Sequence, residues 1–297
     1  MIQVVSLSPA IDVTYELTNV SLGEVHRVQA VHKIAGGKGV NVARVIHSGG
    51  HRVKIVLPLG GSSGQWMREK LEQLGIEAVV VPVHEETRSC VAVVAQDTTV
   101  LNEPAANLTD REFENFLAAL APHVKLSILS GSLPASITSL QLNRLIETLR
   151  KTSEVLVVDT SGPALVMAAE AKCDLLKPNR EEALGATNTT NVAEAIENLL
   201  GKGARAVLLS DGSLGAIFAR PKGNITAAIE PLAGNATGAG DAMVALAAIS
   251  LHEGQSDSEL LRYAIAAGTL AVLQPVAGTI DWKRLEEFAL MVENVEV

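Results

Sequence analysis

Short apolar runs and longer amphipathic stretches alternate along most of the chain. The first run, from Ile2 to Leu7, predicts a buried strand that Ser8-Pro9 brings to an end. After a capping-box-like helix start at Thr109, the two patterns follow each other regularly. Strands are predicted over 126–130, 155–159, 174–177 and 206–209, and helices over 109–120, 138–149 and 192–200. This alternation predicts right-handed βαβ crossovers and a mostly parallel sheet covered by helices on both faces.

The first third of the chain departs from this rhythm in two strand-rich segments, residues 14–34 and 76–101. Both lack much apolar bulk, so we predict that they form a small sheet beside the core, such as a lid. A strand over 53–57 and a helix over 65–74 lie between them, a β-meander covers 215–229, and three helices close the chain. The predicted fold class is α/β, with a mostly parallel central sheet and a small β-sheet lid in one domain, 1–297.

Composition excludes several classes of function. The chain has 297 residues, of which 47% are hydrophobic, and its net charge of −9 with no basic run argues against nucleic-acid binding. The longest uncharged stretch, 264–280, is interrupted by Pro275 and is too short to span a membrane. Cys90 and Cys173 are too few for a disulfide framework. The N-terminus lacks a signal-peptide pattern, so we expect a cytoplasmic protein without a membrane partner.

A flexible turn, 235–240, leads into a long apolar helix, and one carboxylate lies at the junction. Gly238 and Gly240 carry no side chains, so an anion could approach the first amides of the helix, where the dipole is positive. Asp241 would lie beside that anion, placed to accept a proton, and the helix amides should lower its pKa. The alternative is that Asp241 is an ordinary helix N-cap.

A second glycine turn, Gly36-Gly37-Lys38-Gly39, precedes the helical pattern that contains Asn41. Lys38 adds a cation beside exposed amides, which suits phosphate or sugar oxygens, although an ordinary tight turn needs no ligand. The spacing of a Walker A loop is absent from the chain. Asp12 follows an apolar segment, where a buried carboxylate needs hydrogen-bonding partners such as sugar hydroxyls.

Two further turns follow predicted strands. In the first, Asn179 and Glu182 are three residues apart and share one face if a helix starts there. Their oxygens suit a hydrated Mg²⁺, whereas the alternative is a helix cap and its partner. The second turn, 210–215, could wrap a nucleotide or serve only as a hairpin turn.

Nearly all these turns follow strands, so they should gather at one edge of one sheet. Together they contain a base, a metal site and several anion cradles, which are the parts that phosphoryl transfer requires. The sequence therefore favours a phosphoryl-transfer enzyme over a protein that only binds.

Over essentially its whole length, the chain resembles the PfkB carbohydrate kinases, specifically the branch of 1-phosphofructokinase and tagatose-6-phosphate kinase. The motifs that carry the resemblance are, in chain order, Ser8-Pro9-Ala10-Ile11-Asp12, Gly36-Gly37-Lys38-Gly39-Val40-Asn41-Val42-Ala43-Arg44, Asn102-Glu103-Pro104, Ser130-Gly131-Ser132-Leu133-Pro134, Asp159-Thr160-Ser161-Gly162, Lys177-Pro178-Asn179-Arg180-Glu181-Glu182 and Gly238-Ala239-Gly240-Asp241. The resemblance implies a ribokinase-like three-layer α/β/α core, with lid strands contributed by 14–34 and 76–101.

The resemblance also implies a role for each matching residue. By that resemblance, the base is Asp241, and the anion hole is formed by Gly238, Ala239 and Gly240. The sugar is held by Asp12, Gly37, Lys38 and Asn41, and the phosphate on the sugar is held by Arg88. The nucleotide is contacted by Lys177, Asn179, Ser210, Gly212 and Gly215, and Mg²⁺ is held through water by Asn179 and Glu182. ATP and Mg²⁺ are the implied cofactors, and a homodimer through the lid is the implied assembly.

The activity implied is ATP-dependent phosphorylation of a ketohexose phosphate, with a 1-phosphofructokinase-like reaction favoured. Tagatose-6-phosphate or fructose-6-phosphate kinase, a ribokinase-like enzyme for a neutral sugar and a catalytically silent sugar-phosphate sensor are the alternatives. Three residues depart from the family pattern: Thr237 replaces the branch's usual Val, Asp211 replaces an apolar residue, and Ala135 follows Pro134 where Gly is common. The first two leave nucleotide and substrate preference open.

Overall fold

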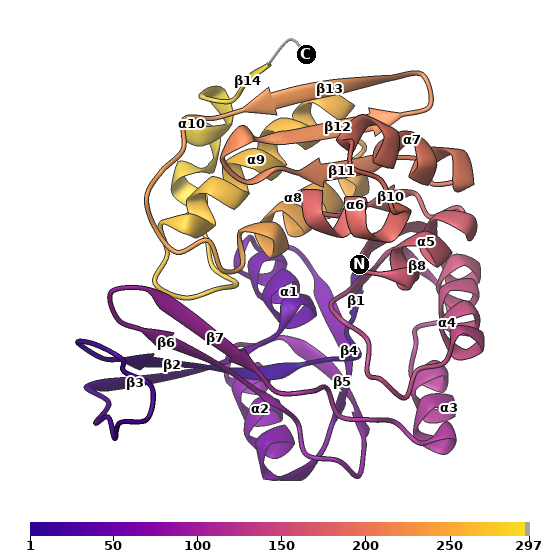
Figure 1. The fold of residues 1–297 in the computed structure, drawn as a ribbon. Helices are drawn as coiled ribbons and strands as arrows, with labels where there is room; N and C mark the ends of the chain where they lie inside the picture. Colours follow the sequence, from indigo (N-terminus) through magenta and orange to yellow (C-terminus); the bar gives the residue numbers. More distant parts are fainter. Residues whose placement is uncertain (295–297) are drawn as a thin grey trace.

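The computed structural model describes residues 1–294 and arranges them around two β-sheets (Figure 1). The strands of the large sheet are β1 (Ile2–Val5), β4 (Val53–Leu59), β5 (Glu77–Pro82), β8 (Val124–Ser130), β9 (Ser153–Asp159), β10 (Leu175–Leu176), β11 (Val207–Ser210), β12 (Ala216–Arg220), β13 (Gly223–Ala228) and β14 (Glu293–Asn294). Their order across the sheet is β14-β13-β12-β11-β10-β9-β8-β1-β4-β5, and strands β5 to β11 of that order pair in parallel. The predicted α/β class with a mostly parallel core is confirmed.

Helices cover both faces of the large sheet. One face carries α1 (Lys38–Ser48), α2 (Gly61–Gln73), α8 (Ala239–Glu253), α9 (Asp257–Val272) and α10 (Leu285–Leu290). The opposite face carries α3 (Asp110–Ala118), α4 (Ser139–Thr152), α5 (Pro163–Glu170), α6 (Arg180–Thr187) and α7 (Val192–Lys202). The strands alternate between the two cores, as a period of two requires: Val4 packs into the first and Val5 into the second. Two short 3₁₀ helices are η1 (Gly212–Leu214) and η2 (Trp282–Arg284).

The small sheet projects from the core beside α1 and α2 (Figure 1). Its strands are β2 (Ala10–Glu16), β3 (Ala30–Gly36), β6 (Ser89–Val94) and β7 (Thr98–Asn102), in the order β3-β2-β6-β7. The prediction that all of 76–101 belongs to this lid is wrong at its first strand, because β5 pairs in parallel with β4 in the large sheet. Helix α2 is the crossover between β4 and β5, so the strand after it returns to the core.

The chain reverses its direction across the large sheet at β1. It proceeds from β1 to β4 and β5, then returns to place β8 on the other side of β1. In parallel sheets a crevice forms at such a switch point, outside the carboxyl ends of the strands. The segments after β1 and β8, which begin at Ser6 and Gly131, therefore flank a natural binding site.

None of the helices within residues 1–294 is both long and apolar enough to cross a membrane. Helix α8 is nevertheless buried on all sides along most of its length, from Asp241 to Ser250. It packs between α1 and α9, which explains its apolar sequence without any lipid contact. This burial fixes the start of α8 rigidly at the switch-point crevice.

Candidate active site

A cavity of about 860 Å³ opens at the carboxyl ends of the strands and extends under the small sheet. Every residue to which the resemblance gave a role lies on its wall. These residues are Asp12, Gly37, Lys38, Asn41, Arg88, Lys177, Asn179, Glu182, Ser210, Gly212, Gly215, Gly238, Ala239, Gly240 and Asp241. Residues separated by more than 200 positions in the chain thus share one space, and the fold alone brings them together.

Helix α8 begins at the cavity with an uncapped N-terminus. Its N-cap is Gly238, in the left-handed region with φ 85°, and no side chain accepts from the first amides. A Cβ on Gly238 would lie 2.8 Å from the Ala277 side chain, and a Cβ on Gly240 would lie 2.9 Å from the Lys177 Nζ. The two glycines therefore allow a left-handed turn and the close approach of an ammonium group. The Ala239 amide donates to the Ala236 carbonyl at 3.2 Å, and the amides of Gly240 and Asp241 are left available to an anion.

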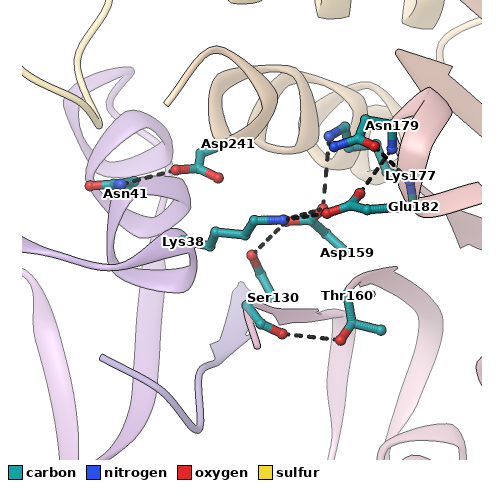
Figure 2. Close-up of polar contacts among 10 residues, drawn as sticks. Lys38, Asn41, Ser130, Asp159, Thr160, Lys177, Asn179, Glu182 and Asp241 are labelled. Atoms are coloured by element: carbon teal, nitrogen blue, oxygen red, sulfur yellow. Dashed lines mark hydrogen bonds and ion pairs between the residues drawn. The ribbon is translucent and has the colours of Figure 1, made fainter. Parts of the chain in front are cut away.

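Asp241 is the third residue of α8 and does not cap it. Its Oδ2 accepts a hydrogen bond of 2.9 Å from the Asn41 Nδ2 of α1 (Figure 2), and only 6% of the residue is exposed. Burial, reinforced by the negative charge of Asp159, raises the pKa of Asp241 to about 7. The expectation that this pKa is lowered is wrong, because desolvation of the carboxylate and the charge of Asp159 outweigh the Asn41 hydrogen bond and the charges of Lys38 and Lys177.

Helix α1 opens in a similar way on the opposite wall. Gly37 is its N-cap at φ 85°, again without a side-chain cap, and its amide donates to the Asp12 Oδ2 at 3.4 Å. A Cβ on Gly36 would lie 2.0 Å from that carboxylate, so only glycine admits Asp12 here. Burial raises the pKa of Asp12, although the Gly37 amide and nearby arginines oppose the shift. The glycine turn and Asp12 form one structural unit.

Two lysines meet at a carboxylate that lies at the end of β9 (Figure 2). The Nζ atoms of Lys38 and Lys177 each lie 3.8 Å from the Asp159 Oδ1, and Ser130 donates to the other oxygen at 3.0 Å. Asp159 is fully buried, and its charge is the largest cause of the raised pKa of Lys38. Lys38 therefore remains cationic at the floor of the cavity.

Helix α6 begins with a complete capping box. Asn179 accepts from the Glu182 amide at 2.8 Å, and Glu182 Oε2 accepts from the Asn179 amide at 2.9 Å. The other oxygen of Glu182 accepts from the Lys38 Nζ at 3.1 Å. The cap that the sequence offered as an alternative is present, and it turns the Glu182 carboxylate toward the cavity.

These residues fit a hydrated magnesium ion better than direct ligation. Within residues 1–294, no three His, Cys, Asp or Glu side chains converge as a ready metal cage. The Asn179 and Glu182 oxygens already accept protein hydrogen bonds, so direct coordination by both would break the capping box. Mg²⁺ commonly keeps several waters and uses one or two carboxylates with substrate phosphates, which this arrangement permits.

Arg88 reaches the cavity from the start of the small sheet. Its guanidinium donates to the Ser8 carbonyl at 3.3 Å and to the Glu103 carbonyl at 3.0 Å. Its Nε is buried and has no hydrogen-bond partner among the described residues. The arginine is thus held in place by backbone carbonyls, with no carboxylate partner within ion-pair distance in residues 1–294.

The turn after β11 is the hairpin that the sequence allowed as an alternative, since β11 and β12 pair antiparallel. Ser210, Gly212 and Gly215 nevertheless line the cavity. Asp211 points to Arg180 and forms an ion pair with it. That pairing accounts for the acidic residue where an apolar one is usual, because an exposed arginine of α6 neutralises it.

Asp159 is the main residue of the site to which the sequence gave no role. Its motif, Asp159-Thr160-Ser161-Gly162, follows a predicted strand, and that position was the available signal. What the sequence could not show is its burial between two lysines that are distant in the chain. Thr160, in the same motif, donates to the Gly131 carbonyl at 3.1 Å and joins this turn to the one after β8.

Known proteins share the sequence pattern and the fold of this chain. The model of the pfkB family carbohydrate kinases matches residues 1–284. A tagatose-6-phosphate kinase from Staphylococcus epidermidis is 30% identical, with 100% of both chains covered. Phosphofructokinase-2 from Escherichia coli, solved with fructose-6-phosphate, is 26% identical, with a TM-score of 0.88 over 98% of each chain.

A Thermotoga maritima protein described as a possible 1-phosphofructokinase has the same fold, with a TM-score of 0.85 and 20% identity over 99% of each chain. The family match over nearly the whole chain and the cavity at the switch point lead to the same conclusion. The chain belongs to the pfkB family of carbohydrate kinases.

Proposed function

We propose that this carbohydrate kinase transfers the γ-phosphoryl group of ATP to a hydroxyl group of a phosphorylated ketohexose. The observation that carries the proposal is Asp241, buried beside the uncapped start of α8 in a cavity that also holds three cations, Lys38, Lys177 and Arg88. A base, free amides and separate cations for two anionic substrates are what phosphoryl transfer needs.

Asp241 accepts the proton of the attacking hydroxyl group. A pKa of about 7 suits a general base near neutral pH, because the carboxylate is then both substantially ionised and basic enough to take the proton. Asn41 holds one carboxylate oxygen through its amide, so the other is left to face the hydroxyl. The sugar lies against Asp12 and the Gly37 turn, where burial makes hydrogen bonds to hydroxyl groups favourable.

The amides at the start of α8 stabilise the charge on the transferred group. A loose transition state requires positioning and charge neutralisation, with little covalent work by the protein. Lys177 lies close to Gly240 and adds a cation on the nucleotide side. The nucleotide lies along Asn179 and the hairpin turn of Ser210, Gly212 and Gly215.

Asn179 and Glu182 would hold Mg²⁺ through water. When bound, the ion supplies neutralisation of charge on the phosphate oxygens of the nucleotide. Glu182 keeps its capping bond and orients the bound waters, while Lys38 is free to turn from Glu182 toward a substrate phosphate.

A phosphorylated sugar is favoured over a neutral one by Lys38 and Arg88, which offer two cations on the sugar side of the cavity. We favour a 1-phosphofructokinase-like reaction that gives a ketohexose bisphosphate and ADP. The names of the Staphylococcus and Escherichia relatives support tagatose 6-phosphate and fructose 6-phosphate as the alternatives. A neutral sugar, as in a ribokinase-like enzyme, is the next alternative substrate.

The small sheet supports a homodimer. Val31, Val100 and Leu101 are each at least half exposed on its strands, and Leu22 is fully exposed in the loop between β2 and β3. Large apolar side chains exposed on one small sheet favour burial against another subunit. The lid sheets of two copies would cover one another.

A coupled assay of ADP release with Mg-ATP tests the proposal. Fructose 1-phosphate, fructose 6-phosphate, tagatose 6-phosphate and free fructose are compared at matched concentrations. We expect one phosphorylated ketohexose to give the highest kcat/KM, and Arg88→Ala to reduce kcat/KM for that sugar far more than for fructose. Equal losses would favour a neutral-sugar kinase. Calorimetric binding of a sugar phosphate without ADP release would favour the silent sensor.

A further inference from the structure

The loop that brings Arg88 to the cavity, residues 83–88, is attached firmly to the large sheet. It runs from β5 in the large sheet to β6 in the small one. Thr87 is 3% exposed, its amide donates to the Gly60 carbonyl at 3.0 Å, and its hydroxyl accepts from the Gly60 amide at 3.0 Å. Thr87, the residue just before Arg88, therefore forms two hydrogen bonds with the turn that follows β4, one as donor and one as acceptor.

A second contact holds the same loop to the start of α2. Glu86 Oε1 accepts from the Ser63 amide at 2.6 Å and from the Ser62 hydroxyl at 3.1 Å. We call the Thr87–Gly60 and Glu86–Ser63 pairs together the latch. An acidic side chain is favourable at the first amides of a helix, so the latch uses the positive end of α2 to hold the loop.

The glycines of the turn after β4 leave room for this loop. A Cβ on Gly60 would lie 2.0 Å from the Glu85 carbonyl oxygen, and a Cβ on Gly61 would lie 1.6 Å from the Glu86 carboxylate. Gly61 also has φ 64°, in the region that favours glycine. A Cβ on Gly64 would lie 3.0 Å from the Thr87 hydroxyl. The proposed reaction makes no use of these glycines, so their fit to the loop calls for another explanation.

Arg88 itself is held at its backbone and at its side chain. Its carbonyl accepts from the Ile11 amide at 2.9 Å, and its guanidinium donates to the Ser8 and Glu103 carbonyls. The latch fixes the backbone immediately before it. A guanidinium that is already fixed loses little conformational freedom when it binds a phosphate, which strengthens binding.

We propose that Thr87, acting through the latch, is a positioning residue for Arg88 and thereby sets the affinity of the enzyme for the phosphate already on the sugar. The proposal rests on the proposed function of Arg88. Thr87 is buried and, in the described part of the chain, is not among the residues that line the cavity, so its effect passes through Arg88. The nucleotide side of the cavity, at Lys177 and Asn179, does not touch the latch.

The test is the Thr87→Val enzyme, because valine keeps the shape of threonine but cannot accept from the Gly60 amide. We expect KM for the ketohexose phosphate that the ADP-release assay selects to rise about tenfold, which corresponds to ~1.4 kcal/mol. Both kcat and KM for ATP should stay within about twofold, as expected for loss of uniform binding of one substrate. For free fructose, kcat/KM should be unchanged. Thr87→Ser keeps the hydroxyl and should restore KM.

Thr138→Val is the matched control. Thr138 caps α4 by accepting from the Gln141 amide at 3.2 Å and makes no hydrogen bond to Arg88, Thr87 or Glu86, so this variant loses a similar hydrogen bond without touching the latch. It should lower Tm and leave KM unchanged. If Thr87→Val does not fold, Glu86→Gln weakens the exposed half of the latch and should raise the same KM by a smaller factor.

An unchanged KM in folded Thr87→Val would overturn the proposal that the latch positions Arg88. If Thr87→Val does not fold, an unchanged KM in Glu86→Gln would overturn it. Equal losses for the sugar phosphate and for fructose also overturn it. Arg88→Ala separates this failure from failure of the proposed function. If Arg88→Ala discriminates between the two sugars and Thr87→Val does not, only the latch is wrong; if Arg88→Ala fails to discriminate, the phosphate role of Arg88 is wrong.

Discussion

Helices α8 and α6 both begin at the cavity, but their first turns are built differently. Helix α8 starts at Gly238 with no side-chain cap, whereas α6 starts at Asn179 with a complete capping box. In α6 the cap satisfies the Glu182 amide, whereas no side chain caps α8, and its Gly240 and Asp241 amides have no acceptor among residues 1–294. We propose that the same local feature, a helix N-terminus at a strand end, serves α8 as an anion site and α6 as a support.

The presence or absence of a cap separates two roles that the sequences of the two helix starts do not distinguish. Each helix start contains a small or polar residue followed by an acidic one, which is typical of an N-cap. In α6 the acidic residue, Glu182, bonds back to the cap and cannot move without breaking it. In α8 the acidic residue, Asp241, accepts from Asn41 of another helix instead of bonding back to its own cap. We infer that the uncapped turn carries the chemistry and the capped one holds its ligands.

The largest expected effect follows from removing the carboxylate at the uncapped turn. Asp241→Asn keeps the size of the side chain and the contact with Asn41 but cannot accept the hydroxyl proton. We predict that kcat falls on the order of 10²-fold or more, the range for loss of a general base. Steady-state ADP release measures this, with KM for both substrates changed much less. Near-wild-type turnover would remove Asp241 from its role.

The same variant should be more stable than the wild type near neutral pH. The pKa of Asp241 rises from 3.8 to about 7 in the folded state, so the folded protein holds a proton that the unfolded chain releases. Stability is therefore lost progressively as pH rises from about 4 to about 7 and then stays level. Thermal unfolding of Asp241→Asn at pH 8 and pH 4 tests this, because the gain in Tm should be confined to the higher pH.

A smaller effect is expected from the glycine that opens the turn. In Gly238→Ala, left-handed backbone and a 2.8 Å contact with Ala277 both oppose the new methyl group, so the amides of α8 should shift. We predict that kcat falls about tenfold. This loss is smaller than the roughly 10²-fold or greater loss that follows complete removal of one oxyanion donor, because the amides shift but are still present. Gly254→Ala is the control at the other end of α8, with φ 75° and open space around it.

Gly254→Ala should cost about 1 kcal/mol of stability from the left-handed backbone alone. Its kcat should remain that of the wild type, because the C-terminal end of α8 lies away from the cavity wall. Equal kcat values for the two glycine variants would mean that the α8 amides do not act on the transferred group.

The sequence predicts the fold and the location of the site because both depend on local patterns. Alternating apolar runs place strands and helices, and turns at strand ends gather at one edge of a parallel sheet. The lid boundary at β5 was wrong because a strand of intermediate burial does not reveal which sheet it joins. The pKa of Asp241 and the importance of Asp159 depend on burial and on contacts between distant segments, which no local pattern reports.

The smallest expected effect concerns the capped turn. Asn179→Ala removes the side chain that accepts from the Glu182 amide, so the Glu182 carboxylate loses its fixed orientation. We predict a KM for Mg-ATP raised about threefold and a stability loss of about 1 kcal/mol, the usual cost of an N-cap. Ser256→Ala removes an equivalent capping box from α9 and should show the stability loss alone. A matching rise in KM in both variants would contradict a specific role for α6.

The pH dependence of kcat/KM for the sugar phosphate, measured in the wild type and in Asp159→Asn, tests most directly whether Asp241 is the base. We predict that wild-type activity falls as pH drops below about 7 and that the acid limb lies at lower pH in Asp159→Asn, because the charge of Asp159 raises the pKa of Asp241. The substrate phosphate titrates identically in both enzymes, so the difference between the limbs belongs to the protein. An acid limb at the same pH in both enzymes, or at higher pH in the variant, would contradict Asp241 as the titrating base.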